Sequence, residues 1–311
     1  MKSWAPLKVG DLVDVVAPGF STTNDKLQAG VEFLKKLGLR VRVPQDLFAP
    51  DVVCANTDAA RFAQFKKALL AKDSKAIWCV RAGYGSIRII EKIAKIKAPR
   101  NPKLFVGYSD ACTIHNYLNQ FWKWPTLHAP LLDKLGQHTL PLEQVNELLE
   151  VVFGNREKVR FEGLEPLNAM ARRRQKVRGA VVGGNLVVTQ SHVGTPFARS
   201  PKGQILVFED TGERGYRVDR CLKHLEMAGY FRGVKAIVFG DFIGGQEPDG
   251  TSKVNAVIER FARERKTPVF RGLEMGHGER QRPVPLGSIA ELIAGPAASL
   301  AISAGWALTR K

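Results

Sequence analysis

In the first half of the chain, short continuous apolar runs alternate with segments in which apolar residues recur every three or four positions. The runs expected to form strands are residues 12–17, 41–44, 76–80 and 104–106. The segments expected to form helices are 27–37, a stretch starting near residue 58, 86–96 and 112–118. This alternation is typical of successive β-α units and predicts a parallel sheet covered by helices on both faces.

In the second half, the alternation stops and then resumes. Residues 154–178 carry eight basic and three acidic side chains with little periodicity, so we expect a basic linker there. Strands are expected at 180–186, 204–210 and 236–239, helices at 217–228 and 254–263, and a hairpin around Gly295-Pro296. The predicted organisation is an N-terminal α/β domain over 1–153, the linker over 154–178, and a C-terminal α/β domain over 179–311.

The pentad Gly107-Tyr108-Ser109-Asp110-Ala111 stands between a predicted strand and a predicted helix. A sharp turn at this place lifts a serine hydroxyl above the sheet, where helix-start amides face it, and this suits a nucleophilic serine. The pentad differs from the usual G-x-S-x-G because Ala111 replaces the second glycine. Ser and Asp are also favoured at helix starts, so a capped helix is the alternative interpretation.

Two later segments supply partners that a nucleophilic serine needs. A predicted buried strand ends in the adjacent carboxylates Glu209-Asp210, and His277 stands between glycines in a predicted loop. An imidazole must take the serine proton during attack, and a carboxylate orients that imidazole, so Ser109, His277 and Glu209 fit nucleophile, general base and orienting acid. The alternative for the carboxylates is neutralisation of Arg214 or Arg217.

Backbone amides near the serine are candidates for stabilising an oxyanion. The Asp110 N–H lies at the predicted helix start, and the loop Gly83-Tyr84-Gly85 can bring a second amide close because glycine lacks a Cβ. A phosphate cradle is the alternative role of this loop, although it lacks a Walker lysine. His115 is the rival base, but it lies about two helical turns from the serine, too far for a direct hydrogen bond.

The composition is that of a soluble enzyme apart from its charge. The formal net charge is +17 and the pI is about 9.9. The densest basic run, Arg172–Arg178, has no interleaved aromatic residues, so a solvated linker is favoured over nucleic-acid binding. No apolar stretch reaches the length of a membrane span and the start of the chain has no apolar signal region, so we expect neither export nor membrane insertion.

The cysteine and histidine positions do not predict a metal site. Four cysteines are scattered without a C-x-x-C pair, which favours buried free thiols and a reducing cytoplasm. The remaining histidines show no metal-ligand spacing and are expected to be structural or on the surface; they are His128, His138, His192 and His224.

These segments together resemble the LD-carboxypeptidases, the muramoyltetrapeptide carboxypeptidases of serine peptidase family S66. The matching blocks run in the family's order over nearly the whole chain: 15–19, 80–85, 107–110, 183–186, 208–220 and 276–277. One departure is Ala82, where the family usually has a second glycine. The resemblance implies that Ser109, Glu209 and His277 form the triad and that Asp110 and Gly83 supply oxyanion amides.

The resemblance also implies an active site at the junction of the two domains, often within a homodimer, and no metal or organic cofactor. The implied reaction is hydrolysis of the amide between the L-centre of a diamino acid, typically meso-diaminopimelate, and the terminal D-alanine of a cell-wall tetrapeptide. A positive field favours capture of such anionic muropeptides. Candidate substrate-binding residues are Arg81, Tyr84, Gly85, Asn185, Arg217 and Arg220.

Two other functions stay open. Microcin C immunity proteins resemble the same family and cleave an aminoacyl-sulfamoyl adenylate, which requires an aromatic surface for the adenine. No tryptophan lies in the matching blocks of the second half, since the five tryptophans are Trp4, Trp78, Trp122, Trp124 and Trp306. A muropeptide- or nucleic-acid-binding protein without catalysis is the third possibility.

Overall fold

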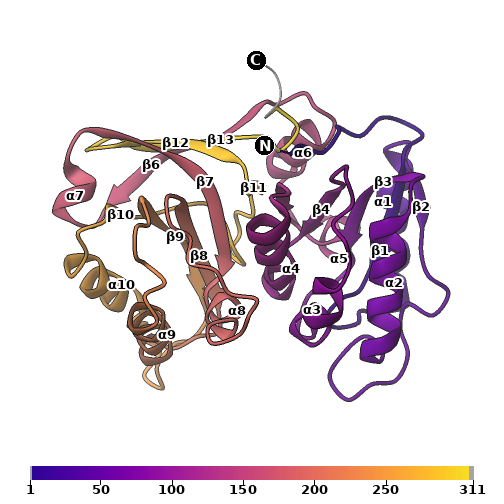
Figure 1. The fold of residues 1–311 in the computed structure, drawn as a ribbon, viewed down its shortest axis with the longest axis horizontal. Helices are drawn as coiled ribbons and strands as arrows, with labels where there is room; N and C mark the ends of the chain where they lie inside the picture. Colours follow the sequence, from indigo (N-terminus) through magenta and orange to yellow (C-terminus); the bar gives the residue numbers. More distant parts are fainter. Residues whose placement is uncertain (1, 308–311) are drawn as a thin grey trace.

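The computed structural model describes residues 2–307 as two halves that lie side by side (Figure 1). A six-stranded sheet with the order β11-β5-β4-β3-β1-β2 forms the N-terminal half. Strands β1 to β5 are parallel to their neighbours, and only β11, from far along the chain, runs antiparallel to β5. The strands are β1 (Leu12–Val16), β2 (Arg40–Arg42), β3 (Ser74–Cys79), β4 (Leu104–Gly107), β5 (Thr126–His128) and β11 (Val284–Leu286).

Helices cover both faces of this sheet, which confirms the predicted architecture. Strand side chains alternate between the faces, so Val15 packs with Leu34 on one side, whereas Val16 packs with Phe65 on the other. One face carries α1 (Asn24–Lys36), α5 (Leu132–Gly136) and α6 (Leu142–Val152). The other face carries α2 (Asp58–Leu70), α3 (Ser86–Ala94), α4 (Cys112–Tyr117) and the π-helical turn Leu118–Trp122.

The C-terminal half is a closed seven-stranded barrel with the order β10-β6-β13-β12-β7-β8-β9. Its strands are β6 (Lys158–Pro166), β7 (Gln175–Asn185), β8 (Ile205–Thr211), β9 (Ala236–Ile243), β10 (Val269–Arg271), β12 (Ile289–Ala294) and β13 (Ala298–Ser303). The run β7-β8-β9-β10 is parallel and the other pairings are antiparallel. The helices of this half are α7 (Ala169–Arg172), α8 (Leu186–Ser191), α9 (Gly215–Met227) and α10 (Val254–Arg263). Strands β12 and β13 form the predicted hairpin.

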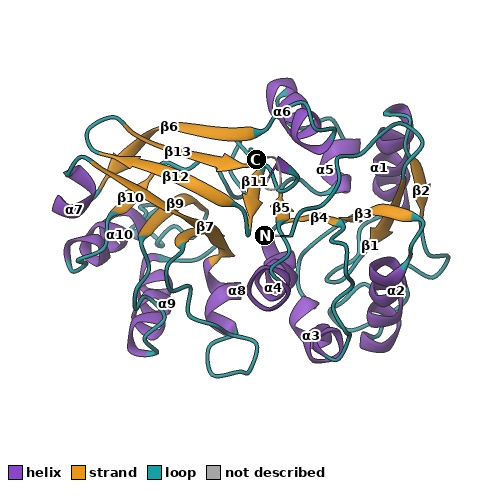
Figure 2. Ribbon diagram, turned by 45° about the horizontal axis from the view of Figure 1, so that its top comes forward, coloured by secondary structure: helices purple, strands orange, loops and turns teal. Residues whose placement is uncertain are grey.

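Residues 154–178 are not the predicted linker but part of the barrel. They form β6, α7 and the start of β7, which lie along the barrel wall (Figure 2). Buried Val159, Phe161 and Leu164 of β6 are spaced among exposed polar and charged residues. A strand with one face in water shows this two-residue period, but a glycine-containing irregularity and the outward charges hide it in the sequence.

The two halves meet along α4 and α8 (Figure 1). The Thr113 hydroxyl of α4 and the His192 imidazole after α8 hydrogen-bond at 3.3 Å, and Asn116 Nδ2 donates to Thr189 Oγ1 at 3.3 Å. Among residues 2–307, no helix combines the length and the apolar character that crossing a bilayer requires. The serine turn begins at this junction, since it leads directly into α4.

Candidate active site

Ser109 occupies a strained turn between β4 and α4. Its φ is +61°, and it begins the 3₁₀ turn Ser109–Ala111. A left-handed conformation costs a non-glycine residue about 1–2 kcal/mol, and such strain at a strand-to-helix turn is typical of a nucleophile elbow. A Cβ on Gly107 would lie 2.9 Å from Ala111 Cβ, so the turn needs glycine there. No side chain caps this turn by a hydrogen bond, which disfavours the interpretation as a capped helix start.

The Asp110 side chain holds the glycine loop beside the serine turn. Its buried carboxylate accepts the Gly85 N–H at 3.2 Å and the Ser86 N–H at 2.9 Å. Burial raises the pKa of Asp110, and the hydrogen bonds from Ser86 and Gly85 oppose that shift. These amides at the start of α3 are therefore already engaged by a carboxylate, which disfavours the phosphate cradle. The contact fixes the loop that carries Gly83 next to the residue after Ser109.

Glu209 and His277 form a direct pair. Glu209 lies on β8 with 0% exposure, and His277 Nδ1 is 2.7 Å from Glu209 Oε2. The His277 side chain is 16% exposed, so the imidazole connects a buried carboxylate to the surface of the site. Burial alone would raise the pKa of Glu209, but the facing imidazoles of His128 and His277 lower it to about 2. A carboxylate that accepts the Nδ1 proton leaves Nε2 of a neutral imidazole available as a base.

The His277 imidazole lies against the serine turn. Its ring centroid is 4.7 Å from that of Tyr108, the residue before Ser109. Within residues 2–307 the structure describes no hydrogen bond between the Ser109 hydroxyl and His277. Catalytic hydrogen bonds often tighten only when substrate binds. The third contact of the triad therefore stays a prediction, supported by the position of the imidazole.

A glycine lets the histidine loop approach the acid. Gly276 has φ +133°, and a Cβ there would lie 3.0 Å from Glu209 Cβ and 3.1 Å from Asp241 Cβ. Both halves of the molecule hold the loop: Asp241 N donates to Met275 O at 2.8 Å, and Gln281 N donates to Gln144 Oε1 of α6 at 2.7 Å. The loop is thus anchored on either side of the imidazole that it presents.

Two groups near Glu209 were not expected from the sequence. His128 Nε2 is 3.8 Å from Glu209 Oε1, and Asp241 lies beside the glycines that flank His277. Burial raises the pKa of Asp241 to about 6, and the charges of Glu209 and Glu274 add to the increase. His128 ends β5, whose register pairs it with Gly107. Only the strand order brings His128 to the site, and no local pattern could have indicated that order.

Asp210 has a structural role different from that of Glu209. Its carboxylate accepts Asn185 Nδ2 at 2.9 Å, Val187 N at 2.9 Å and Thr211 N at 2.8 Å. Burial raises the pKa of Asp210 to about 6, and the charge of Glu209 contributes. Asn185 Oδ1 accepts Val188 N at 3.0 Å, so both ends of its side chain are engaged within the protein. Asn185 therefore has a helix-capping role, which weakens its candidacy for substrate binding.

Gly85 is buried, whereas the side chains of the candidates Arg81, Tyr84 and Arg217 lie at or near the surface. Arg81 Nη1 donates to the buried Asp133 at 2.8 Å, and Tyr84 is 47% exposed. Arg217 is exposed and donates to the Tyr216 hydroxyl at 3.1 Å. The structure describes no contact of these side chains with Ser109, so their roles in substrate binding stay predictions.

Two alternatives from the sequence can now be judged. Arg214 pairs with Glu247 and Arg217 lies 3.7 Å from Glu213, so these arginines have carboxylate partners other than Glu209 and Asp210. His115 is fully buried, with Nδ1 2.7 Å from Thr126 Oγ1 and Nε2 2.9 Å from Gly107 O.

Burial lowers the pKa of His115 to about 3, and both ring nitrogens are engaged within the protein. This agrees with its exclusion as the base.

Family models match both halves of the chain. Residues 13–129 match the LD-carboxypeptidase N-terminal domain, and residues 178–292 match the LD-carboxypeptidase C-terminal domain. A Bacillus subtilis protein described as a "probable murein peptide carboxypeptidase" is 30% identical over 92% of this chain and 90% of its own length.

Solved structures show the same fold. The muramoyltetrapeptide carboxypeptidase of Oxalobacter formigenes aligns with a TM-score of 0.81 and 25% identity, covering 94% of this chain and 98% of that one. The microcin C7 self-immunity protein MccF, solved with aspartyl sulfamoyl adenosine, aligns with a TM-score of 0.82 and 19% identity, covering 98% and 99%. At 19% identity the second match supports a statement about the fold only. The two domain matches and the murein peptide carboxypeptidase relative show that this chain belongs to the LD-carboxypeptidase family, peptidase family S66.

Proposed function

We propose that this protein is a serine-type LD-carboxypeptidase. Its reaction would be hydrolysis of the amide between the L-centre of a meso-diaminopimelate-type residue and the terminal D-alanine of cell-wall tetrapeptides. The observation that carries the proposal is the Glu209–His277 pair at 2.7 Å, set against the strained turn that begins at Ser109. The murein carboxypeptidase relatives support the substrate class.

In the proposed mechanism, Ser109 Oγ attacks the carbonyl carbon of the peptide while His277 Nε2 takes its proton. The Asp110 and Gly83 N–H groups stabilise the oxyanion of the tetrahedral intermediate. Collapse of that intermediate breaks the C–N bond, and the imidazolium gives its proton to the departing D-alanine amine. Water then cleaves the acyl-enzyme with His277 again as base. The 0% exposure of Glu209 strengthens its attraction for the imidazolium, because little water screens the pair.

The positive surface supports an anionic substrate. The net charge of +17 favours the encounter with a peptide that carries several carboxylates. Arg81, just before the glycine loop, and Tyr84, within it, are the candidates for contacts close to the serine. Gly85 is a weaker candidate, because its N–H already donates to Asp110. Arg217 is a candidate for a more distant contact, since it lies on α9 in the other half.

The alternative substrate is an aminoacyl-sulfamoyl adenylate, which the MccF neighbour binds in its solved complex. Stacking an adenine needs an aromatic face open to solvent. All five tryptophans of this chain are at most 7% exposed, so a stacked adenine would have to use another aromatic side chain, such as the exposed Tyr84 or Tyr216. Supplying each substrate separately to the purified protein distinguishes the two.

Ser109→Ala tests the nucleophile. We expect turnover of a defined tetrapeptide to fall at least about 10³-fold, because the hydroxyl that forms the acyl-enzyme is gone. Mass spectrometry should show loss of one D-alanine with wild type and none with the variant. Ser191→Ala, at the exposed last residue of α8, is the matched control and should keep wild-type turnover. Unchanged turnover in a folded Ser109→Ala protein would refute the assignment.

The cytoplasmic location, the homodimer and the independence from cofactors complete the proposal. Four free, buried cysteines fit a reducing compartment. Light scattering coupled to gel filtration should give twice the chain mass for the dimer. Turnover after exhaustive treatment with a chelator should not fall below that of the untreated protein.

A further inference from the structure

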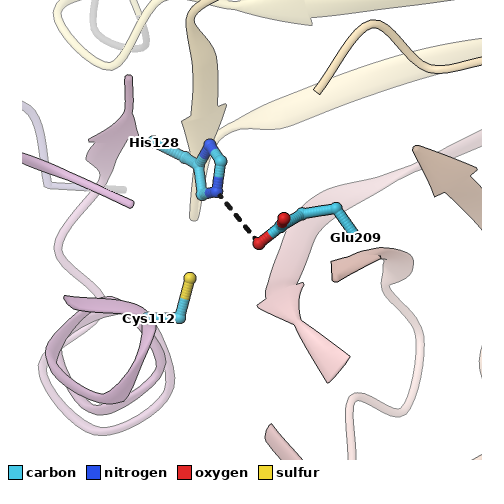
Figure 3. Close-up of side chains that lie close together, drawn as sticks. All are labelled: Cys112, His128 and Glu209. Atoms are coloured by element: carbon cyan, nitrogen blue, oxygen red, sulfur yellow. Dashed lines mark ion pairs between the residues drawn. The ribbon is translucent and has the colours of Figure 1, made fainter. Parts of the chain in front are cut away.

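Three buried side chains from three separate elements, Cys112, His128 and Glu209, point toward one another (Figure 3). Cys112 begins α4, His128 ends β5, and Glu209 lies on β8 of the other half. The closest ligand-type atoms are Cys112 Sγ, one imidazole nitrogen and one carboxylate oxygen, all within 4.8 Å of one another. The exposed fractions of the three residues are 0%, 2% and 0%. The cluster spans the junction of the two halves and includes Glu209, the proposed catalytic acid.

Two of these atoms lack partners. His128 Nε2 and Glu209 Oε1 are buried and make no hydrogen bond with any residue in the described chain. They face each other at 3.8 Å, which is too long for a hydrogen bond. Leaving a buried polar atom unsatisfied costs about 1–3 kcal/mol, so a species that bonds to both atoms would be stabilised here.

A glycine lets β7 pack closely against the sulfur. A Cβ on Gly184 would lie 2.5 Å from Cys112 Sγ and 3.8 Å from His128 Cδ2. Only a residue without a side chain therefore fits beside the sulfur at this point of β7. The next residue donates its backbone N–H to Cys112 Sγ at 3.3 Å, a contact that stabilises negative charge on sulfur.

The donor set is one thiol, one imidazole and one carboxylate, a combination that suits Zn²⁺. Bonds of about 2.0–2.3 Å in tetrahedral geometry separate the ligand atoms by about 3.3–3.6 Å. The observed separations are 3.8 Å for His128 and Glu209 and up to 4.8 Å within the cluster, so metal binding would draw the ligand atoms together by up to about 1.5 Å. We propose that Cys112, His128 and Glu209 bind a zinc-type divalent ion, and that this ion inhibits the enzyme.

Metal binding would release one proton, that of the Cys112 thiol, to the solvent. The Cys112 thiol loses its proton, a Zn–S bond forms, and Nε2 of neutral His128 and Oε1 of Glu209 complete the three protein ligands. Burial raises the pKa of the Cys112 thiol well above its usual value, so the ion competes with a tightly held proton.

The inhibitory part of the inference rests on the proposed function. Glu209 uses Oε2 to orient His277 and would use Oε1 for the metal. A cation on Oε1 withdraws negative charge from the carboxylate and opposes a positive charge on the neighbouring imidazole. The imidazolium formed during attack by Ser109 would lose stabilisation, so turnover should fall as the site fills.

The test uses Co²⁺ as a spectroscopic probe and Zn²⁺ as the competing ion. Chelator-treated full-length protein is titrated with Co²⁺ while its absorption is recorded, because a thiolate ligand gives a near-ultraviolet charge-transfer band. We expect one Co²⁺ per chain with this band and its displacement by one equivalent of Zn²⁺. Equilibrium dialysis with Zn²⁺ should show at least tenfold weaker binding for Cys112→Ser and for His128→Ala. Cys221→Ser removes another buried thiol, on α9 in a different core, and should bind like wild type.

The outcomes separate the site from the reaction. Absence of a thiolate band, or equal Zn²⁺ binding by wild type and Cys112→Ser, would overturn the metal site; the wild-type spectrum decides even where a variant does not fold. A thiolate band with unchanged turnover of the tetrapeptide at saturating Zn²⁺ would overturn the inhibitory role. A protein that binds the ion but hydrolyses no tetrapeptide would contradict the proposed function and leave the metal site standing.

Discussion

Glu209→Gln replaces a fully buried carboxylate with an amide of nearly the same shape. The change removes the charge that faces His277 Nδ1 at 2.7 Å and leaves the backbone of β8 in place. If the amide group donates to Nδ1, the imidazole proton is forced onto Nε2, and the base faces the serine in the wrong tautomer. In the chymotrypsin-type triad the equivalent change lowers kcat about 10⁴-fold, which corresponds to about 5.5 kcal/mol.

The amide can also turn its oxygen toward Nδ1, with its NH₂ group toward His128 Nε2. The tautomer is then correct, but the negative charge that stabilises the imidazolium is still missing. We therefore expect a loss of turnover between about 10² and 10⁴, within the range reported for charge removal at catalytic sites. Initial rates of D-alanine release, followed by mass spectrometry, measure it. Circular dichroism melting checks that the variant is folded.

Asp210→Asn is the matched control, because it neutralises the adjacent carboxylate in the same strand. Asp210 receives its hydrogen bonds from Asn185, Val187 and Thr211, and none from His277. We expect turnover within about tenfold of wild type. A loss of less than tenfold in folded Glu209→Gln, or an equal loss in both variants, would refute the assignment of Glu209 as the orienting acid.

Two further predictions concern stability and the histidine loop. The pKa of Asp210 rises from the ordinary value of 3.8 to about 6 in the native state, so the contribution of this group to stability falls by about 2 kcal/mol as pH rises from 4 to 7. This component should vanish in Asp210→Asn, and urea unfolding at both pH values measures it; an identical pH dependence would contradict the raised pKa. Gly276→Ala should lower turnover at least about tenfold, because its Cβ would collide with Glu209 at a positive φ. Gly250→Ala is the control, because Gly250 has a similarly left-handed backbone (φ +81°) but no atom within 4 Å of the added Cβ. This variant should keep wild-type turnover. Equal rates in the two alanine variants would contradict the steric explanation.

Sequence patterns predicted an element correctly where the residues of that element carry a recognisable local signal. The serine turn is one case, since a strand, a glycine and a helix start are all visible around Ser109, and the hairpin around Gly295 is another. Strand β6 was missed because its outward charges suggested a linker. The pairing of Glu209 with His277 was inferred from residue type and chain order, and in the structure His277 Nδ1 lies 2.7 Å from Glu209 Oε2.

Residues that reach the site only through strand order could not be predicted. His128 ends a three-residue strand whose neighbours in space are β4 and β11, and nothing in its local sequence indicates either pairing. Asp241 lies in β9, where a bulge shifts the register with β8 between Phe208 and Asp210. Asn185, proposed as a substrate-binding residue, has its side chain engaged in capping α8 and in donating to Asp210, an arrangement that its glycine-rich block did not indicate. The residue types at these positions indicated polar side chains, but not which groups those side chains would contact.

Strand β11 belongs to the N-terminal sheet although it follows most of the barrel strands in the chain, so a cut between the two halves removes a strand from that sheet. After the loop of His277 the chain leaves the barrel and adds Val284–Leu286 to the free side of β5, where Val284 pairs with His128. A fragment ending near residue 153 would leave that side of β5 open to water, and an uncovered strand of this kind promotes aggregation. We expect separately expressed halves to be insoluble and to fail at reconstitution, whereas a single nick at the exposed Gly250 turn should leave the assembly joined.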